Sequence, residues 1–199
     1  MDTERSKSFV VHSGIDVNFW ELRLPGVDEV RPGRCPCCGA ASRPPGQPVV
    51  LVGHGLRDRQ VRGPPAPGQV PRTRTVRARR YRCRACASVI TVVPRGIAVR
   101  KHYGAGAIGL ALLLYGSGLA AGIVRHAIAG TGDGELRWRA LVRWIGAVDA
   151  GSLFPRVRPA PPGWSRRQRA ERAAATLRAV SPLGADEASQ VFDGAARAA

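Results

Sequence analysis

Short runs of β-branched and apolar residues, separated by glycine and proline, dominate the first half of the chain. The runs that predict strands are 48–52, 57–62 and 88–94. Residues 53–55, Gly-His-Gly, are expected to end the first strand, so that 57–62 returns as a short second one. The proline- and glycine-rich residues 63–71 predict a loop. This region is therefore expected to form small β-hairpins.

The second half of the chain has a helical pattern. Residues 105–124 are twenty residues without a charge, which is the length of a membrane span. The run also holds five glycines, with Gly116 and Gly118 near its middle, so two short helices with a turn are the favoured interpretation. The helices expected here are 105–115, 119–129 and 135–148, and the first two have the outline of a helix-turn-helix. A membrane span at 105–124 is the alternative.

The two ends of the chain differ in composition from the middle. The N-terminal arm, residues 1–30, carries Phe19, Trp20 and other apolar residues that either pack on the β region or bind a partner. Four prolines within 155–162 predict a linker, after which Ser165 is placed to cap a helix that runs to residue 180. The arginines of that helix either contact phosphates or are simply solvated. Residues 181–199 are expected to be disordered.

The net charge narrows the class of partner. The chain has 31 Lys+Arg against 14 Asp+Glu, a formal net charge of +17. Residues 31–103 alone hold sixteen basic residues and one acidic residue, so nearly all of the excess lies there. A coding bias toward arginine would spread the charge more evenly. This clustering favours a polyanion, such as nucleic acid or an anionic membrane surface, as the partner.

Arginine is densest just before the second group of cysteines, where seven of the thirteen residues at 72–84 are arginine. In an extended chain Arg74, Arg80, Arg82 and Arg84 would share one face, because side chains alternate between the faces of a strand. The residues expected to contact DNA are Arg72, Arg74, Arg77, Arg79, Arg80, Arg82, Arg84, Arg100, Lys101 and Arg125. The helix that carries Arg125 offers no polar side chain before it, so shape and phosphate contacts are expected to outweigh base recognition.

Five cysteines lie in the same basic block. Cys35 and Cys38 form one C-x-x-C pair, and Cys83 and Cys86 form another. Two such turns brought together supply four thiolates in a tetrahedron, which predicts a closed structural Zn²⁺ site. The small residues after each pair, glycine and alanine, relieve crowding where the chain turns away.

Other interpretations of the cysteines are weaker. Cys37 is predicted not to be a ligand, because adjacent cysteines chelate one ion poorly. Four unpaired thiols or a redox pair are alternatives, but a redox motif needs one C-x-x-C between a strand and a helix. A zinc deaminase is disfavoured, because no histidine is followed two places on by glutamate.

These motifs resemble a known family. Residues 35–39 (Cys-Pro-Cys-Cys-Gly), 80–86 (Arg-Tyr-Arg-Cys-Arg-Ala-Cys) and 141–145 (Leu-Val-Arg-Trp-Ile) are similar to the N-terminal zinc-ribbon and helix-turn-helix region of bacterial insertion-sequence transposases. The resemblance covers roughly residues 31–150. It implies binding to the ends of a mobile element or other DNA, with Cys35, Cys38, Cys83 and Cys86 as the metal ligands.

The chain departs from that family in its catalytic part. A three-carboxylate transposase needs an RNase H-like domain of about 150 residues or more, which exceeds the length of chain after residue 148. The acidic residues beyond that point lie among proline, alanine and arginine, with no strand pattern to hold two Mg²⁺ ions. We therefore expect no strand-transfer activity and no enzyme.

The sequence thus predicts an α+β protein with four parts. These are an N-terminal arm (1–30), a four-cysteine zinc ribbon (31–96), a helix-turn-helix-like helical domain (97–150), and a flexible linker and tail (151–199). The expected function is zinc-dependent binding of double-stranded DNA, derived from or associated with a transposase whose catalytic subunit is a second candidate partner. No secretory signal is recognised in the arm, so a cytoplasmic, nucleoid-associated location is expected. The alternatives are a membrane-anchored zinc ribbon and an adaptor that binds RNA or protein.

Overall fold

A computed structural model describes residues 7–99, 101–130, 138–181 and 185–199, and it divides the chain into two compact units. The first, here called the sheet unit, comprises Met1–Arg59 and Thr75–Arg95. The second, the helical unit, comprises Gln60–Arg74 and Gly96–Ala199. The described residues form one four-stranded mixed sheet and six helices, so the fold is α+β.

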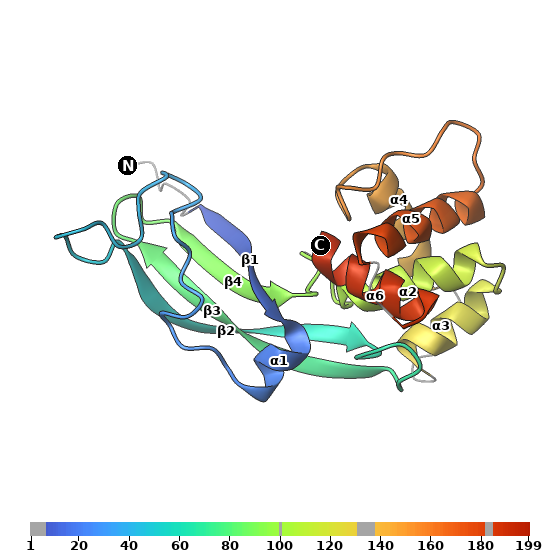
Figure 1. The fold of residues 1–199 in the computed structure, drawn as a ribbon, viewed down its shortest axis with the longest axis horizontal. Helices are drawn as coiled ribbons and strands as arrows, with labels where there is room; N and C mark the ends of the chain where they lie inside the picture. The colour runs from blue at the N-terminus through green and yellow to red at the C-terminus, as the bar shows by residue number, and fades with distance from the viewer. Residues whose placement is uncertain (1–6, 100, 131–137, 182–184) are drawn as a thin grey trace. The chain divides into compact units, whose positions relative to one another are not determined.

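The strands of the sheet follow the order β1-β4-β3-β2. Their bounds are Ser8–Asp16 for β1, Leu51–Gly63 for β2, Arg72–Cys83 for β3 and Val89–Arg95 for β4. β1 pairs in parallel with β4, whereas β3 and β4 are antiparallel (Figure 1). The last residues of β2 and the first of β3 belong to the helical unit. Because β1 pairs with β4, the sheet joins segments that lie far apart in the sequence.

β2 differs from the expected pair of short strands. It is a single strand of 13 residues that passes through Gly53 and Gly55 without ending. Gly55 has φ +80°, a conformation that glycine adopts without strain, and an added Cβ on Gly53 would lie 3.2 Å from the Val27 side chain. Gly53 therefore lets the strand pass close to the N-terminal arm, and Gly55 supplies a backbone conformation that the strand uses without ending.

The N-terminal arm packs on the sheet, which is one of the two alternatives open for it. Besides β1, it contains the short helix α1 (Val17–Leu22). The Trp20 side chain is buried and its Nε1 donates a hydrogen bond to the Arg77 carbonyl at 2.9 Å. The buried Tyr81 hydroxyl donates to the Val27 carbonyl at 2.5 Å. Strand, helix and following loop thus form part of one core with β3 and β4.

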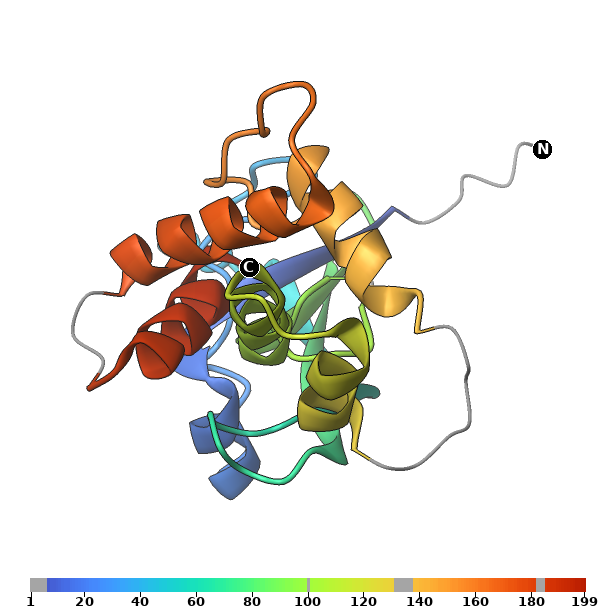
Figure 2. The same cartoon turned by 90° about the vertical axis from the view of Figure 1, so that its right-hand side faces the viewer.

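The helical unit is arranged around α2, which contacts each of the other four helices of the unit (Figure 2). The bounds are Ala105–Gly116 for α2, Ala121–Ala129 for α3, Ala140–Asp149 for α4, Arg166–Val180 for α5 and Glu187–Ala198 for α6. Two glycines of α2 allow α6 to pack closely against it. An added Cβ on Gly106 would lie 2.4 Å from the Phe192 ring, and one on Gly109 would lie 2.6 Å from the Ala195 Cβ. These glycines therefore mark helix contacts.

The expected helices are largely present, with two corrections. Ser165 caps α5 in a full capping box with Gln168, as its position predicts. Part of the third expected helix, residues 135–137, lies outside the described residues, and α4 begins only at Ala140. The expectation of a disordered 181–199 is wrong, because α6 packs against α2 and α5 and buries Val191 and Ala195.

The linker expected at 155–162 is also tied to the helical core. Leu153 and Phe154, just before it, and Val157 within it are buried in that core, and Asp149 pairs with Arg169 across the segment. The described part of the predicted flexible tail is therefore packed, through small side chains on α6 and apolar side chains in this loop.

Residues 105–124, which have the length of a membrane span, form parts of two helices instead of one. None of the helices in the described part of the chain combines the length and the hydropathy needed to cross a membrane.

Candidate metal centre and basic surface

Four sulfur atoms meet at one end of the sheet. The Sγ atoms of Cys35, Cys38, Cys83 and Cys86 all lie within 4.8 Å of one another. The Cys35–Cys86 and Cys38–Cys83 sulfurs are 3.7 and 3.8 Å apart. A disulfide would need about 2.05 Å, whereas four sulfurs placed tetrahedrally at about 2.3 Å from a Zn²⁺ ion would be about 3.8 Å apart. The prediction that these four cysteines form one candidate metal site is confirmed.

Each cysteine pair sits in the same local turn. In the first, the Cys35 N–H donates to the Ala40 carbonyl and the Gly39 N–H to the Cys35 carbonyl, each at 2.9 Å. In the second, the Cys83 N–H donates to the Ser88 carbonyl at 3.0 Å, and the Cys83 carbonyl accepts from the Ala87 N–H at 2.9 Å. The two turns therefore have matching hydrogen bonds.

The same turns direct backbone N–H groups at the sulfurs. The N–H groups of Cys37 and Cys38 donate to the Cys35 sulfur, and those of Ala85 and Cys86 donate to the Cys83 sulfur. Such bonds stabilise thiolates, which are the form that binds metal. The geometry fits a bound cation better than four neutral thiols.

The residue after each pair is small because of its backbone conformation. Gly39 has φ +74°, and Ala87 has φ +58°, so both lie in the left-handed region where a Cβ is costly. Glycine adopts this conformation freely, and alanine is the smallest side chain that can be placed there. Ala87 is one of two non-glycine residues with positive φ in the described chain.

Ser88 contacts two of the sulfurs without being one of the four clustered ligands. Its side chain is buried, and its hydroxyl lies 3.4 Å from the Cys35 sulfur and 3.1 Å from the Cys86 sulfur. This hydroxyl and the Ser88 N–H lower the pKa of Cys86 to about 6, whereas burial raises the pKa of Cys83 to about 12. No local pattern in the sequence indicates this contact, because Ser88 lies outside the C-x-x-C motif.

Cys37 is not among the four clustered ligand atoms. It stands between the two cysteines of the first turn and is half-buried. Its N–H takes part in the turn by donating to the Cys35 sulfur. This agrees with the prediction that adjacent cysteines do not chelate the same ion.

The arginines expected to contact DNA divide between the two units. Arg77, Arg79, Arg80, Arg82 and Arg84 belong to the sheet unit, and Arg72, Arg74, Lys101 and Arg125 to the helical unit. Arg100 lies outside the described residues. The ten residues therefore do not form a single surface on one unit.

Within the sheet unit the arginines of β3 point to both faces. Arg80 and Arg82 share one face of the strand, and the alternating Arg77 and Arg79 occupy the other. Arg84 lies beyond the end of β3, in the second cysteine turn, so it does not share the strand face that the alternation predicted. Arg77, Arg82 and Arg84 are exposed.

Two further basic residues were missed by the sequence reasoning. Arg57 and Arg59 lie on β2, two residues apart and hence on one face. Burial and the neighbouring charge of Arg57 lower the pKa of Arg59.

Six arginine side chains of the sheet unit have neither an ion-pair nor a hydrogen-bond partner among the described residues. They are Arg57, Arg59, Arg77, Arg80, Arg82 and Arg84. An anion bound beside Arg57 and Arg59 would relieve the repulsion between these two.

Three arginines of α5, in the helical unit, have structural roles. Arg169 pairs with Asp149, and Arg178 with Glu187 at 2.7 Å. Arg167 donates to the Tyr115 carbonyl at 3.1 Å and lies over the Tyr115 ring. These side chains of α5 hold helices and loops together, which leaves them less available to phosphates than the arginines of the sheet unit.

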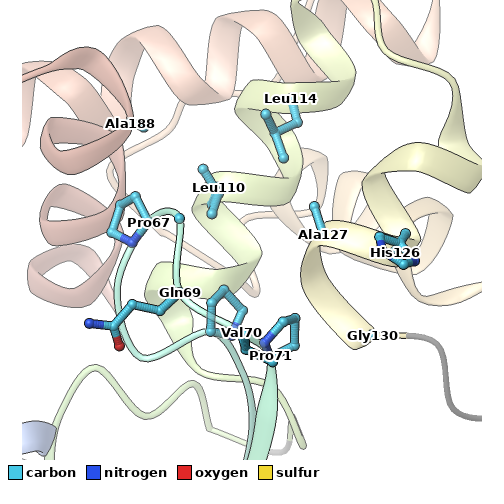
Figure 3. Close-up of a pocket in the computed structure, with 12 residues that line it drawn as sticks. Pro67, Gln69, Val70, Pro71, Leu110, Leu114, His126, Ala127, Gly130 and Ala188 are labelled. Atoms are coloured by element: carbon cyan, nitrogen blue, oxygen red, sulfur yellow. The ribbon is translucent and has the colours of Figure 1, made fainter.

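The helical unit also has a pocket of about 540 Å³ beside the loop between β2 and β3 (Figure 3). Val70 and Pro71 of that loop face Leu110 and Leu114 of α2 across it. Among the described residues that line it, His126 is the one with an ionisable side chain. The described lining therefore offers no pair of groups for acid–base chemistry.

No protein-family model, curated protein or solved structure matches this chain.

Proposed function

We propose that this protein is a zinc-stabilised DNA-binding protein whose basic sheet unit contacts the phosphate backbone. The observation that carries the proposal is the occurrence of the six arginines without described partners in the same unit as a four-cysteine site. The cysteine turns flank the segment that carries β2 and β3. A metal held there would therefore also fix the strands that present the arginines.

Zinc is the metal that we favour for the site. A closed set of four thiolates suits a structural Zn²⁺ ion, and no fifth ligand or open position is needed. The sheet unit is small, so the free energy of metal binding would be a large part of its folding free energy. Iron can also occupy four-thiolate sites, and elemental analysis distinguishes the two metals.

Metal content and chelation test the first half of the proposal. Purified protein is expected to carry one zinc per chain by elemental analysis, and a strong chelator is expected to lower its unfolding temperature because it removes that ion. Cys83→Ser should abolish stoichiometric zinc, whereas Cys37→Ser should keep it. A metal-free protein that chelator does not destabilise would contradict the proposal, and iron with visible absorption would correct the identity of the metal.

DNA binding at increasing salt tests the second half. Arginines that neutralise phosphates release counterions, so the affinity for a duplex should fall about 10³-fold or more between about 50 and 200 mM salt if about six phosphates are contacted. Arg57→Gln with Arg59→Gln should make this dependence less steep. Arg178→Gln, whose partner is Glu187, is the matched control. An affinity that does not change with salt, or no binding at low salt, would refute the proposal.

The resemblance to transposase ribbons supports DNA as the polyanion, and the link to transposases is itself a proposal. If the protein acts with a separate transposase subunit, it would bring that subunit to DNA and need no carboxylates of its own. Competition between duplex DNA and structured RNA of equal length would distinguish this role from that of an RNA adaptor.

A further inference from the structure

Helix α1 presents two large apolar side chains to solvent. Phe19 is 62% exposed and Leu22 is 84% exposed. They are three positions apart on a helix, so they lie on one face. Single exposed apolar residues are common, but an adjacent phenylalanine and leucine on one short helix indicate a binding surface.

This helix is held firmly. The Asp16 carboxylate caps it by accepting a hydrogen bond from the Asn18 N–H at 2.9 Å. Trp20, between the two exposed residues, is buried and bonded to the Arg77 carbonyl. At the other end of the helix, the Arg23 N–H donates a hydrogen bond to the Phe19 carbonyl at 3.2 Å. The apolar pair therefore stands on a fixed support, which reduces the entropy cost of using it in binding.

The helix is anchored on the arginine-bearing strand β3. Trp20 anchors α1 on the Arg77 carbonyl of β3. In the loop after α1, the Pro25 carbonyl accepts a hydrogen bond from the Arg79 Nε at 2.8 Å. Arg77 is exposed and has no carboxylate partner among the described residues. Helix α1 is thus anchored on the strand that carries Arg77, one of the six arginines that the proposed function assigns to the DNA backbone.

The described carboxylates of the arm do not cancel this charge. Asp28 pairs with two arginines and Glu29 pairs with one. Asp16 caps α1 and lies 3.9 Å from Arg95. Glu21 is the remaining carboxylate on α1 and is exposed. The negative charge of the described part of the arm is therefore largely neutralised by arginines.

We propose that Phe19 and Leu22 form a wedge that inserts between neighbouring base pairs of duplex DNA held by the sheet-unit arginines. This inference rests on the proposed DNA binding and specifies its mode. Phenylalanine and leucine are side chains that partially unstack base steps and kink the duplex. Burial of the two side chains and the added phosphate contacts would offset the cost of unstacking.

A wedge of this kind predicts a preference among DNA structures. In a duplex with an internal mismatch the stacking is already weakened, so less free energy is spent on insertion. The protein should therefore bind mismatched DNA more tightly than a fully paired duplex of the same length and charge. Arginine contacts alone would bind both equally, because the phosphates are the same.

The test compares two fluorescent duplexes of identical length, one fully paired and one with a central two-base mismatch, using the full zinc-loaded chain. The wild-type protein should bind the mismatched duplex on the order of tenfold more tightly. Phe19→Ala should remove that preference and change the affinity for the paired duplex by less than about threefold, and Leu22→Ala should reduce the preference. Val70→Ala, at a similarly exposed position of the helical unit, is the control and should keep it.

Each other outcome has a defined meaning. A preference that Phe19→Ala retains overturns the wedge, as does equal binding of both duplexes by the wild type. Equal weakening of both duplexes by a folded Phe19→Ala variant also overturns it, and Phe19→Trp, which should keep the preference, guards against a folding defect. A dimer in solution that Phe19→Ala dissociates would overturn the wedge by assigning the surface to self-association. No binding of either duplex at low salt would refute the proposed function itself.

Discussion

Ser88 shows how a single side chain can tune the cysteine cluster without being a ligand. Its hydroxyl contacts the sulfurs of Cys35 and Cys86, which come from different turns. It therefore links the two halves of the site and favours the thiolate form of Cys86, whose pKa it lowers. Residues that orient metal ligands in this way commonly affect the affinity for the metal, although they do not bind it themselves.

Replacing Ser88 tests this role. Ser88→Ala should weaken zinc binding by about 10- to 100-fold, because a buried hydroxyl that contacts two sulfurs is lost. The measurement is competition with a chromophoric chelator at fixed pH. Ser152→Ala, which removes an exposed hydroxyl bonded to the Ala147 carbonyl in the helical unit, should leave the affinity unchanged. Wild-type affinity in Ser88→Ala would show that the backbone N–H groups alone support the site.

At the scale of elements, the sequence was most informative where the signal was local. The cysteine pairs and the capping box of α5 each lie within a few residues, and the structure contains both. The glycines between 105 and 124 predict breaks in a helix, but Gly106 and Gly109 instead admit α6 against α2. That role depends on a helix some 80 residues away, so no local pattern could have indicated it.

The close packing of α6 gives a stability prediction. An added Cβ on Gly194 would lie 1.9 Å from the Leu177 carbonyl oxygen, so Gly194→Ala should force α5 and α6 apart and destabilise the protein by about 1–3 kcal/mol. Gly146 of α4 has no atom within 4 Å of an added Cβ, so Gly146→Ala should be neutral or stabilising by up to about 1 kcal/mol. Urea unfolding followed by tryptophan fluorescence measures both. Equal stability of the two variants would contradict the observed packing.

Over the whole molecule, the fold redistributes the charge that the sequence concentrates. Counted by unit, the sheet unit has 14 basic and 7 acidic residues, and the helical unit has 17 and 7, which give net charges of +7 and +10. The basic block at 31–103 is thus divided, because β2 and β3 contribute residues to both units. What distinguishes the sheet unit is that its arginines without described partners occur in the same unit as the four-cysteine site.

The N-terminal arm also belongs to the whole-molecule picture, because β1 covers one edge of β4. Deleting residues 1–30 removes β1 and the buried Trp20, so the backbone groups of β4 become an open edge that can pair with other chains. The truncated protein should aggregate in size-exclusion chromatography, whereas the full chain should not. A monomeric truncated protein with unchanged resistance to chelator would show that the sheet does not need the arm.

The parallel pairing of β1 with β4 has a consequence for synthesis. Ser8 pairs with Val89, so about 80 residues must be translated between the two strands. At about 5–20 residues per second, β1 leaves the ribosome on the order of 4–16 s before its partner exists. During that interval β1 lacks its partner strand β4, and for part of it the first cysteine pair lacks the second. The nascent chain is therefore most exposed to chaperones and to stray metal before its sheet can close.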